Sequence, residues 1–330
     1  MKFRGLTLTI IFDGFSLNYG ESIGNFSELK KLTENGKSYS YLSRQALRYE
    51  IYKKLVEVYN IDADKDIPLT KEKEVIQFKS EANIKDYIEI DLFGYMKTEK
   101  KKGKNKTKNK ENHQEIEEEL EENNQKNENK TKKRSSIVRI NHAISLLPMA
   151  FDVEFGTNLN FAERLATDSN IFQQEIHKSL YTYTLTIDLD KIGVDENDNI
   201  KLENIEKAKR VNMILDVLMF LDRDIKGRTE NLSPLFVIGG LYPIKNPFFL
   251  GRIKVNYDRT QDKYSIDTHL IESVLKLKIQ ENTIKEYTSC GIIEGFWANE
   301  EYIKQNLKGK DISEFFDDLK LEVNKYYGVK

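Results

Sequence analysis

The sequence predicts an α+β protein with a ferredoxin-like split βαβ core. Two observations lead to this class. Segments 3–12 and 181–189 alternate apolar with polar residues, which is the period of a sheet strand, and segments 43–60 and 203–221 repeat apolar residues at helical spacing. In chain order the elements read strand, helix, strand and then strand, helix, strand, with insertions between them.

The first strand and the first helix are the clearest elements. From Leu6 to Phe12 every second residue is large and apolar. The following segment, residues 16–40, is rich in Asn, Gly and Ser, and we expect it to be a loop. A helix is expected to begin at Ser43 and to run to about Asn60, because apolar residues form one stripe along it.

The remaining elements follow from the same two periods. An apolar segment, residues 137–147, ends at Pro148. Further strands are expected at 181–189, 235–241, 249–257 and 291–296, and further helices at 203–221, 268–277 and 312–326.

One segment, residues 97–134, does not fit a packed core. It consists almost entirely of Lys, Asn, Glu and Gln, with Ile116 and Leu120 as its only large apolar residues. Such a composition buries too little apolar surface to offset the entropy of ordering the chain, so we expect a disordered insertion. Its deletion is expected to leave the thermal stability nearly unchanged.

Charge is spread unevenly along the chain. The formal net charge is −2, but residues 97–134 hold 13 basic and 9 acidic residues, a net of +4, which leaves −6 for the rest. A general positive field is therefore excluded as the basis of nucleic-acid binding. Any such site must be a local cluster of cations.

Composition also bears on the compartment. Cys290 is the only cysteine, so neither an internal disulfide nor a cysteine metal cluster can form. No run approaches the roughly 20 apolar residues that a membrane span needs. The first segment is too polar for a secretory signal. We expect a soluble, cytoplasmic protein without a membrane partner.

The sequence offers no combination of residues typical of an active site. The four histidines stand apart, and no nucleophile elbow, Walker loop or dinucleotide fingerprint occurs. Asp13 precedes Gly14 and is better explained as a turn residue. His142 and His177 are more typical of surface or satisfied core histidines. We therefore expect no catalytic residue, no metal ligand and no cofactor.

Residues near the start of the first helix give a stronger signal. Ser43 fits an N-cap, and Arg44 and Arg48, four residues apart, share one helix face. A helix N-terminus offers free N–H groups and the positive end of the helix dipole, which suits a phosphate. The preceding segment 18–25 contains glycines that allow its backbone to approach a ligand closely. An ordinary capped helix with solvated arginines explains these residues equally well.

A second basic group lies downstream. Lys226-Gly227-Arg228 falls between an expected helix and an expected strand, and Phe248-Phe249 precede Arg252. Exposed aromatic rings beside cations suit single-stranded nucleic acid, in which bases stack and phosphates pair with cations. Core packing is the more common role of either phenylalanine taken singly.

Several motifs, in their order along the chain, resemble the DevR family of CRISPR-associated proteins, which are backbone subunits of type I Cascade complexes. The first is the helix start Ser43-Arg44-Gln45-Ala46-Leu47-Arg48 after an Asn- and Gly-rich segment. Motifs that resemble the type I-B branch of this family are Asp91-Leu92-Phe93-Gly94-Tyr95-Met96, Arg139-Ile140-Asn141-His142, Phe155-Gly156-Thr157-Asn158, Phe161-Ala162-Glu163-Arg164 and Gly227-Arg228-Thr229-Glu230.

The resemblance implies a modified RRM-like palm with a helical finger insertion and a thumb-like projection. By position, residues 1–60 and 151–330 would form the palm, with the thumb within about 222–250. Residues 61–150 would form the finger insertion that contains 97–134. The family further implies that copies of the chain stack along a guide RNA (crRNA) and, with other Cascade subunits, support its pairing with target DNA in antiviral defence.

Such a subunit is expected to hold ribose and phosphate and to ignore base identity, since guides differ in sequence. By position, the resemblance carries RNA contact onto Asn18, Ser22, Gly24, Asn25, Ser43, Arg44, Gln45, Arg48, Arg139, Arg164, Lys226 and Arg228.

Three other functions remain open from the residues alone. The first is a type III-like backbone subunit that cleaves target RNA through Asp13. The second is a guide-processing ribonuclease with His142 or His177 as general base. The third is a DNA-binding autoregulator, which ranks lowest because no helix-turn-helix with a basic recognition helix is visible.

Overall fold

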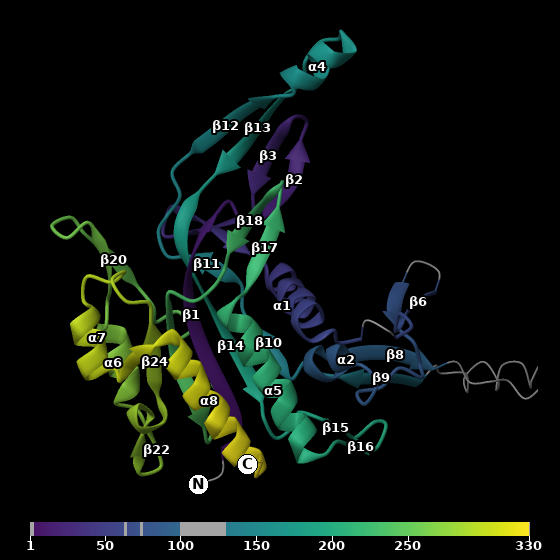
Figure 1. Cartoon of the computed structure of the whole chain (residues 1–330), viewed down its shortest axis with the longest axis vertical. Coiled ribbons are helices and arrows are strands. Elements are labelled where there is room, and N and C mark those ends of the chain that lie inside the picture. The colour runs from purple at the N-terminus through teal and green to yellow at the C-terminus, as the bar shows by residue number, and fades with distance from the viewer. Residues whose placement is uncertain (1–2, 63–64, 73–74, 100–129, 330) are drawn as a thin grey trace, which may run out of the picture.

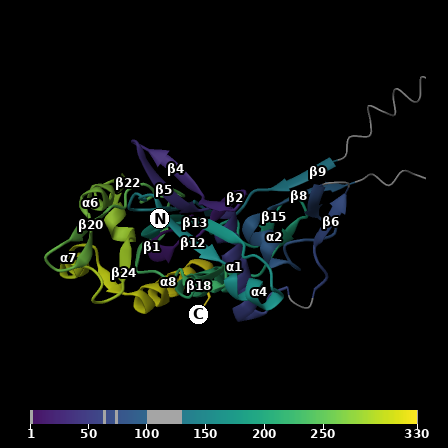
Figure 2. The same cartoon turned by 90° about the horizontal axis from the view of Figure 1, so that it is seen from above.

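A nine-stranded sheet lies at the centre of the computed structural model, which describes residues 3–62, 65–72, 75–99 and 130–329. Helices cover one face of this sheet, a long arm extends from one end of it, and a smaller segment extends sideways (Figures 1 and 2). The mixed α+β class that the sequence predicts is confirmed. No helix among the described residues has the length and apolar character to cross a membrane.

The sheet is built around its longest strands. From one edge to the other the strands are β25 (Gly309–Asp311), β24 (Ser289–Ile292), β19 (Phe236–Tyr242), β1 (Gly5–Phe15), β14 (Lys178–Asp188), β11 (Ala143–Ser145), β5 (Lys37–Leu42) and β4 (Lys31–Glu34), with β10 (Val138–Ile140) also paired to β14. β1 is antiparallel to both neighbours, with Leu8 opposite Leu185 of β14 and Gly239 of β19.

Three helices cover one face of the sheet: α1 (Arg44–Tyr59), α5 (Asn204–Met219) and α8 (Ile312–Tyr327) (Figure 1). The fully buried Leu47 and Ile51 of α1 pack in the same core as Leu8 of β1. The side chain of Ser43 accepts a hydrogen bond from the Ala46 N–H, and Asn60 ends the helix in the left-handed conformation. Both expected ends of this helix are thereby confirmed.

A lobe, residues 244–307, packs against the opposite face of β19 and β1 around a second core that includes Phe236 and Trp297. Its elements are β20 (Val255–Asp258), β21 (Lys263–Ile266), α6 (His269–Leu275), β22 (Lys278–Ile279), β23 (Asn282–Thr283), the 3₁₀ turn η1 (Ile284–Tyr287) and α7 (Glu300–Asn306). The strand expected at 249–257 is wrong in its first half, where the chain turns, and only 255–257 lie in a strand.

The arm is a four-stranded sheet capped by a short helix. It contains β12 (Asp152–Thr157), α4 (Leu159–Leu165) and β13 (Ile171–Ile176), joined by β2 (Tyr19–Ile23) and β3 (Phe26–Leu29). The loop expected at 16–40 is therefore wrong, since β2, β3, β4 and most of β5 lie in it. These strands are short and largely exposed, so their sequence lacks the alternation of a half-buried strand.

The range 222–250, in which the thumb is expected, begins with a hairpin of β17 (Asp222–Ile225) and β18 (Arg228–Asn231) at the base of the arm (Figure 1). It continues into β19, a fully buried strand in the interior of the main sheet. Among the described residues, the part that projects farthest from the main sheet is the arm (Figure 1).

A lateral segment, residues 65–72, 75–99 and 130–134, forms the sideways extension (Figure 2). Its elements are β6 (Leu69–Glu72), β7 (Val75–Phe78), α2 (Ile88–Phe93), β8 (Tyr95–Glu99) and β9 (Lys130–Arg134), and it lies beside the hairpin of β15 (Val194–Asp195) and β16 (Ile200–Lys201). The described residues of this segment do not form a mainly helical insertion, because they contain one short helix and two antiparallel strand pairs.

The disordered insertion expected at 97–134 is wrong at both ends. The Lys97 side chain is buried and its Nζ lies 3.2 Å from Asp198, and residues 130–134 pair with β8 as strand β9. The rest of that prediction falls on residues 100–129, which lie outside the described residues.

Candidate functional site

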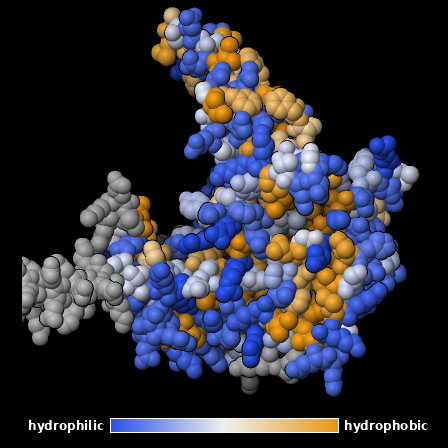
Figure 3. Space-filling model, turned by 180° about the vertical axis from the view of Figure 1, so that it is seen from behind, coloured by the Kyte–Doolittle hydropathy of each residue, from blue (hydrophilic) through white to orange (hydrophobic). Residues whose placement is uncertain are grey.

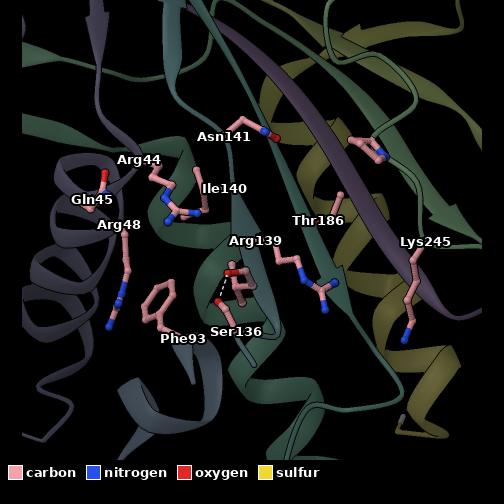
Figure 4. A pocket seen from close by; sticks show the side chains of 12 residues that line it. Arg44, Gln45, Arg48, Phe93, Ser136, Arg139, Ile140, Asn141, Thr186 and Lys245 are labelled. Carbon is pink, nitrogen blue, oxygen red and sulfur yellow. Dashed lines mark hydrogen bonds between the residues drawn. The ribbon is translucent and has the colours of Figure 1, made fainter. Parts of the chain in front are cut away.

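A cleft of about 660 Å³ opens on the face of the sheet that points away from α5 and α8 (Figure 4). Figure 3, which shows this side of the molecule, has hydrophilic side chains across its middle and apolar surface over the lobe. The cleft is lined by Arg44, Gln45, Arg48, Phe93, Ser136, Val138, Arg139, Ile140, Asn141, Thr186, Lys245 and Pro247. It thus brings together four of the residues predicted to contact RNA: Arg44, Gln45, Arg48 and Arg139.

The N-terminus of α1 forms one wall of the cleft. Ser43 caps the helix, and the Arg44 backbone N–H donates a hydrogen bond of 3.0 Å to Nδ1 of His142. Burial, followed by the charges of Arg44 and Lys30, lowers the pKa of His142, which keeps this imidazole neutral and able to accept. The Arg44 side chain is exposed and pairs with no carboxylate of the described residues. Its charge is available to a ligand.

Arg48 lies one turn further along α1 and is already engaged. Its Nη2 is 2.9 Å from Oε1 of Glu89, and its guanidinium stacks 4.6 Å above the centre of the Phe93 ring. Burial raises the pKa of Glu89, an effect that the charge of Arg48 partly opposes. A ligand at this point meets a cation whose charge is partly neutralised.

The floor of the cleft carries a second pair of cations. The two terminal nitrogens of Arg139 lie 2.9 and 3.0 Å from the two carboxylate oxygens of Asp188. Nζ of Lys245 lies 2.6 Å from Asp190 and 3.5 Å from the same Asp188. The sequence prediction missed Lys245, because it follows β19 in an irregular turn where no period marks it.

A further group of predicted residues lies in the arm rather than in the cleft. The Ser22 and Ser27 hydroxyls are 3.1 Å apart across the β2–β3 hairpin, and Gly24 occupies its turn with a φ of +62° that favours glycine. Nδ2 of Asn25 donates a hydrogen bond of 3.2 Å to the carbonyl oxygen of Ile171 in β13. Asn18 is buried, and its Nδ2 finds no hydrogen-bond acceptor within the described parts of the chain.

Of the three predicted basic residues outside the cleft, Lys226 and Arg228 are held by the protein itself. Nζ of Lys226 donates a hydrogen bond of 2.7 Å to Oε1 of Gln174 and lies 3.7 Å from the centre of the Tyr19 ring. Arg228 donates to the carbonyls of Phe15 and Ser16, at 3.0 and 3.1 Å, and also pairs with Glu230. Arg164 lies in α4, at the far end of the arm (Figure 1). The structure therefore separates these three residues from the cleft.

Of the residues of the enzymatic alternatives, Asp13 and His177 lie outside the cleft, whereas His142 lies beside Arg44 at its wall. The carboxylate of Asp13 is 3.5 Å from Nζ of Lys178, and no three His, Cys, Asp or Glu residues among those described are grouped as a metal site. His177 is buried with its Nδ1 2.7 Å from the Ser40 hydroxyl, which in turn lies 2.6 Å from the Tyr181 hydroxyl. Burial lowers the pKa of His177.

An α+β fold with a cationic cleft beside a capped helix defines a class of protein suited to anionic ligands. The family described as "CRISPR-associated negative auto-regulator DevR/Csa2" matches residues 6–257. This chain belongs to that CRISPR-associated family, and the resemblance to the DevR family noted in the sequence is confirmed.

Comparison with one solved structure supports the fold. A chain of a "CRISPR RNA-guided surveillance complex, pre-nicking" superposes with a TM-score of 0.50 at 11% sequence identity, covering 96% of this chain and all of that one. A chain of another "CRISPR RNA-guided surveillance complex" covers 72% of this chain and 68% of its own length, at 12% identity and a TM-score of 0.38. No curated protein sequence matches this chain.

Proposed function

We propose that this protein is the RNA-binding, repeating backbone subunit of a type I-B Cascade surveillance complex and acts in the cytoplasm in antiviral defence. The observation that carries the proposal is the cleft, which is lined by the cationic side chains Arg44, Arg48, Arg139 and Lys245 from three separate parts of the chain (Figure 4). Family membership and the fold shared with a surveillance-complex chain agree with it.

The fold offers the parts that such a subunit needs. The core follows the order β1, α1, β10 with β11, β14, α5, β19, and its strands lie in the spatial order β19-β1-β14-β10. This is the order of a split βαβ fold, which supports the proposed palm. On this proposal the lateral segment is the finger. The arm, rather than residues 222–250, is the thumb-like projection.

The chemistry of the cleft suits a backbone ligand better than a base. A helix N-terminus and guanidinium groups bind phosphate oxygens, and such contacts carry no sequence information. Thr186 and Ser136, which also line the cleft, add hydroxyl groups that can bond ribose or phosphate. A guide RNA of any sequence can be held in this way, with its bases left free to pair with target DNA.

The arm supplies a contact surface for a further copy of the chain. Its side chains Phe155, Phe161 and Leu165 are 60%, 62% and 76% exposed, which is more apolar surface than solvent contact alone explains. The lobe also exposes apolar surface (Figure 3). An arm of one copy on the body of the next is a head-to-tail contact, which repeats along a filament.

The function is tested by titrating a single-stranded RNA with the purified chain at several salt concentrations. Substitution of both Arg44 and Arg48 by alanine is expected to weaken binding equally for RNAs of different sequence and to make the dependence of affinity on salt less steep. Lys209 and Lys325, exposed on α5 and α8, provide a control double variant with the same loss of charge. Equal affinities and salt slopes for the two double variants would refute RNA binding by the cleft.

A second measurement examines the assembly. The tagged protein is purified from cells that carry its neighbouring genes, and the bound RNA is sequenced. Short RNAs of one length that each contain spacer flanked by repeat are expected. Random fragments, or no RNA, would contradict the proposal.

We further propose that the subunit is not itself a nuclease. Asp13 is paired with Lys178, and the two histidines that could act as bases are hydrogen-bonded within the fold. Incubation with complementary RNA and Mg²⁺ is expected to leave the RNA intact. Metal-dependent cleavage that is lost in Asp13→Ala would establish the type III-like alternative instead.

A further inference from the structure

The cations of the cleft are opposed by carboxylates from the same protein. Arg48 faces Glu89, Arg139 faces Asp188, and Lys245 faces both Asp188 and Asp190. In this cleft only Arg44 has no carboxylate partner among the described residues. The free protein therefore presents much less positive charge to RNA than its four cationic side chains suggest.

Asp188 is the centre of this arrangement. Its side chain is 2% exposed, and it bonds Arg139 through both carboxylate oxygens while also lying 3.5 Å from Lys245. Arg139, in contrast, is 48% exposed, so the pair is half buried and is only partly screened by solvent. A phosphate that approaches Arg139 must compete with a fixed carboxylate that already occupies the bidentate face of the guanidinium.

We propose that Asp188 lowers the RNA affinity of the cleft by restraining Arg139 and Lys245 in the free subunit, so that an isolated copy binds RNA weakly. This inference rests on the proposed function of the cleft. Strong binding then requires several copies on one RNA, because each copy alone supplies little net charge and linked sites multiply their affinities. Random cellular RNA that meets a single copy is released.

The opposite role of Asp188 is also chemically reasonable and predicts an opposite result. A buried carboxylate can orient an arginine so that its remaining N–H groups face a ligand. In that case removal of the carboxylate disorders Arg139 and weakens RNA binding. The direction of the change in affinity therefore separates restraint from orientation.

The test uses Asp188→Asn in the full chain, with binding of a single-stranded polyuridylate followed by fluorescence anisotropy. The asparagine keeps the shape of the side chain and removes its charge. Each freed cation adds a salt slope of about −0.7 for a single strand, which corresponds to about fivefold tighter binding at about 0.1 M salt. We expect a gain of that size in Asp188→Asn, and a steeper dependence on salt.

Two further variants guard against misfolding and against general charge effects. Asp190 is 38% exposed, and Asp190→Asn, which removes only one of the two carboxylate partners of Lys245, is expected to give a smaller gain without disturbing the core. Asp317→Asn removes an exposed carboxylate on α8, which lies on the opposite face of the sheet, and is expected to change RNA affinity little. An equal gain in all three variants would overturn the proposal, because it would show a general effect of net charge.

A double-mutant cycle with Arg139→Ala completes the experiment. Loss of Arg139 is expected to reduce affinity more in the Asp188→Asn background than in the wild-type background, since only there is the guanidinium free. Unchanged or weaker binding by both aspartate variants overturns the inference. If Arg44→Ala still weakens RNA binding, the proposed RNA site in the cleft stands. No effect of Arg44→Ala on wild-type binding overturns the proposed function itself.

Discussion

Asp91 of the lateral segment and Arg210 of α5 form an ion pair inside the protein, with 2.8 Å between Oδ2 and Nη1. Asp91 is fully buried and Arg210 is 2% exposed. The second carboxylate oxygen of Asp91 lies 2.6 Å from Nη2 of Arg134, at the end of β9, and the Gly193 N–H donates to the same carboxylate. One carboxylate thus joins the lateral segment to the main core.

Asp91→Ala is expected to lower the free energy of unfolding by about 3–5 kcal/mol, because it leaves two buried guanidinium groups without their shared partner. Denaturant titration of the full chain measures this loss. Asp317→Ala, which breaks an exposed pair with Lys320 on α8, is the control and is expected to change stability by less than about 1 kcal/mol. Similar losses in the two variants would contradict the structural role assigned to Asp91.

Two deletions of different length test the boundaries of the insertion. Removal of 97–134 deletes Lys97 and Lys132, which both pair with Asp198. It also deletes Arg134, which pairs with the buried Asp91 and Asp195. We expect this deletion to lower the melting temperature by several degrees, in contrast to the expectation from sequence. Glu99 and Lys130 face each other at the end of the β8–β9 ladder, so a two-residue turn can join them after removal of 100–129. The variant that lacks 97–134 is expected to have a lower melting temperature than the variant that lacks 100–129. Identical melting temperatures would contradict this prediction.

Arg44→Ala and Arg228→Ala are expected to act on different properties, although both residues are predicted from sequence to bind RNA. Arg44 is exposed in the cleft, so its loss should weaken RNA binding and reduce the salt slope by about 0.7. Arg228 donates to two backbone carbonyls beside β1, so its loss should reduce stability by about 1–3 kcal/mol and leave the salt slope unchanged. Paired anisotropy and denaturation measurements distinguish the two effects. A reduced salt slope in Arg228→Ala would place that residue against RNA.

Acidification is expected to destabilise the fold through two histidines. Burial lowers the pKa of both His142 and His177 from the ordinary value of 6.5. Between the lowered pKa and 6.5 the unfolded chain binds protons that the folded protein does not, so the free energy of unfolding falls as the pH drops through this window and is highest above it.

The melting temperature, measured as a function of pH, checks this expectation. His142→Gln should flatten part of the acid dependence, because one of the two titrating groups is removed. His269→Gln, which removes an exposed histidine at the start of α6, provides the control. If His142→Gln and wild type lose stability in parallel between neutral pH and pH 5, His142 does not contribute.

The first helix could be predicted from sequence because its signals are local. Ser43 marks its start, Asn60 its end, and Leu47 and Ile51 its buried face, and all four behave as expected. The helix start also pointed to Arg44 and Arg48, which do line the cleft. Where an element owes its structure to residues near it in the chain, a single sequence contains enough information.

The arm and half of the cleft could not be predicted, because they depend on contacts between residues that are distant in the sequence. β3 pairs in parallel with β13, where Phe26 aligns with Gln173, more than a hundred residues away, and no local period reports such a contact. Lys245 reaches the cleft only because β19, β1 and β14 lie side by side in the sheet. Arg228 is of a residue type that commonly binds RNA, but its hydrogen bonds to the carbonyls of Phe15 and Ser16 are revealed only by the fold.

Because β12 pairs with β13, the length of the arm can change only in discrete steps. Asp152 lies opposite Ile176, so the chain leaves the body and returns to it at one point. One residue added to each strand would lengthen the arm by about 3.3 Å but would turn its apolar side chains to the other face. Two residues per strand would extend it by about 7 Å and preserve the face. If copies of the chain touch through this arm, the spacing between them can change during evolution only in increments of that size, while the central sheet keeps its register.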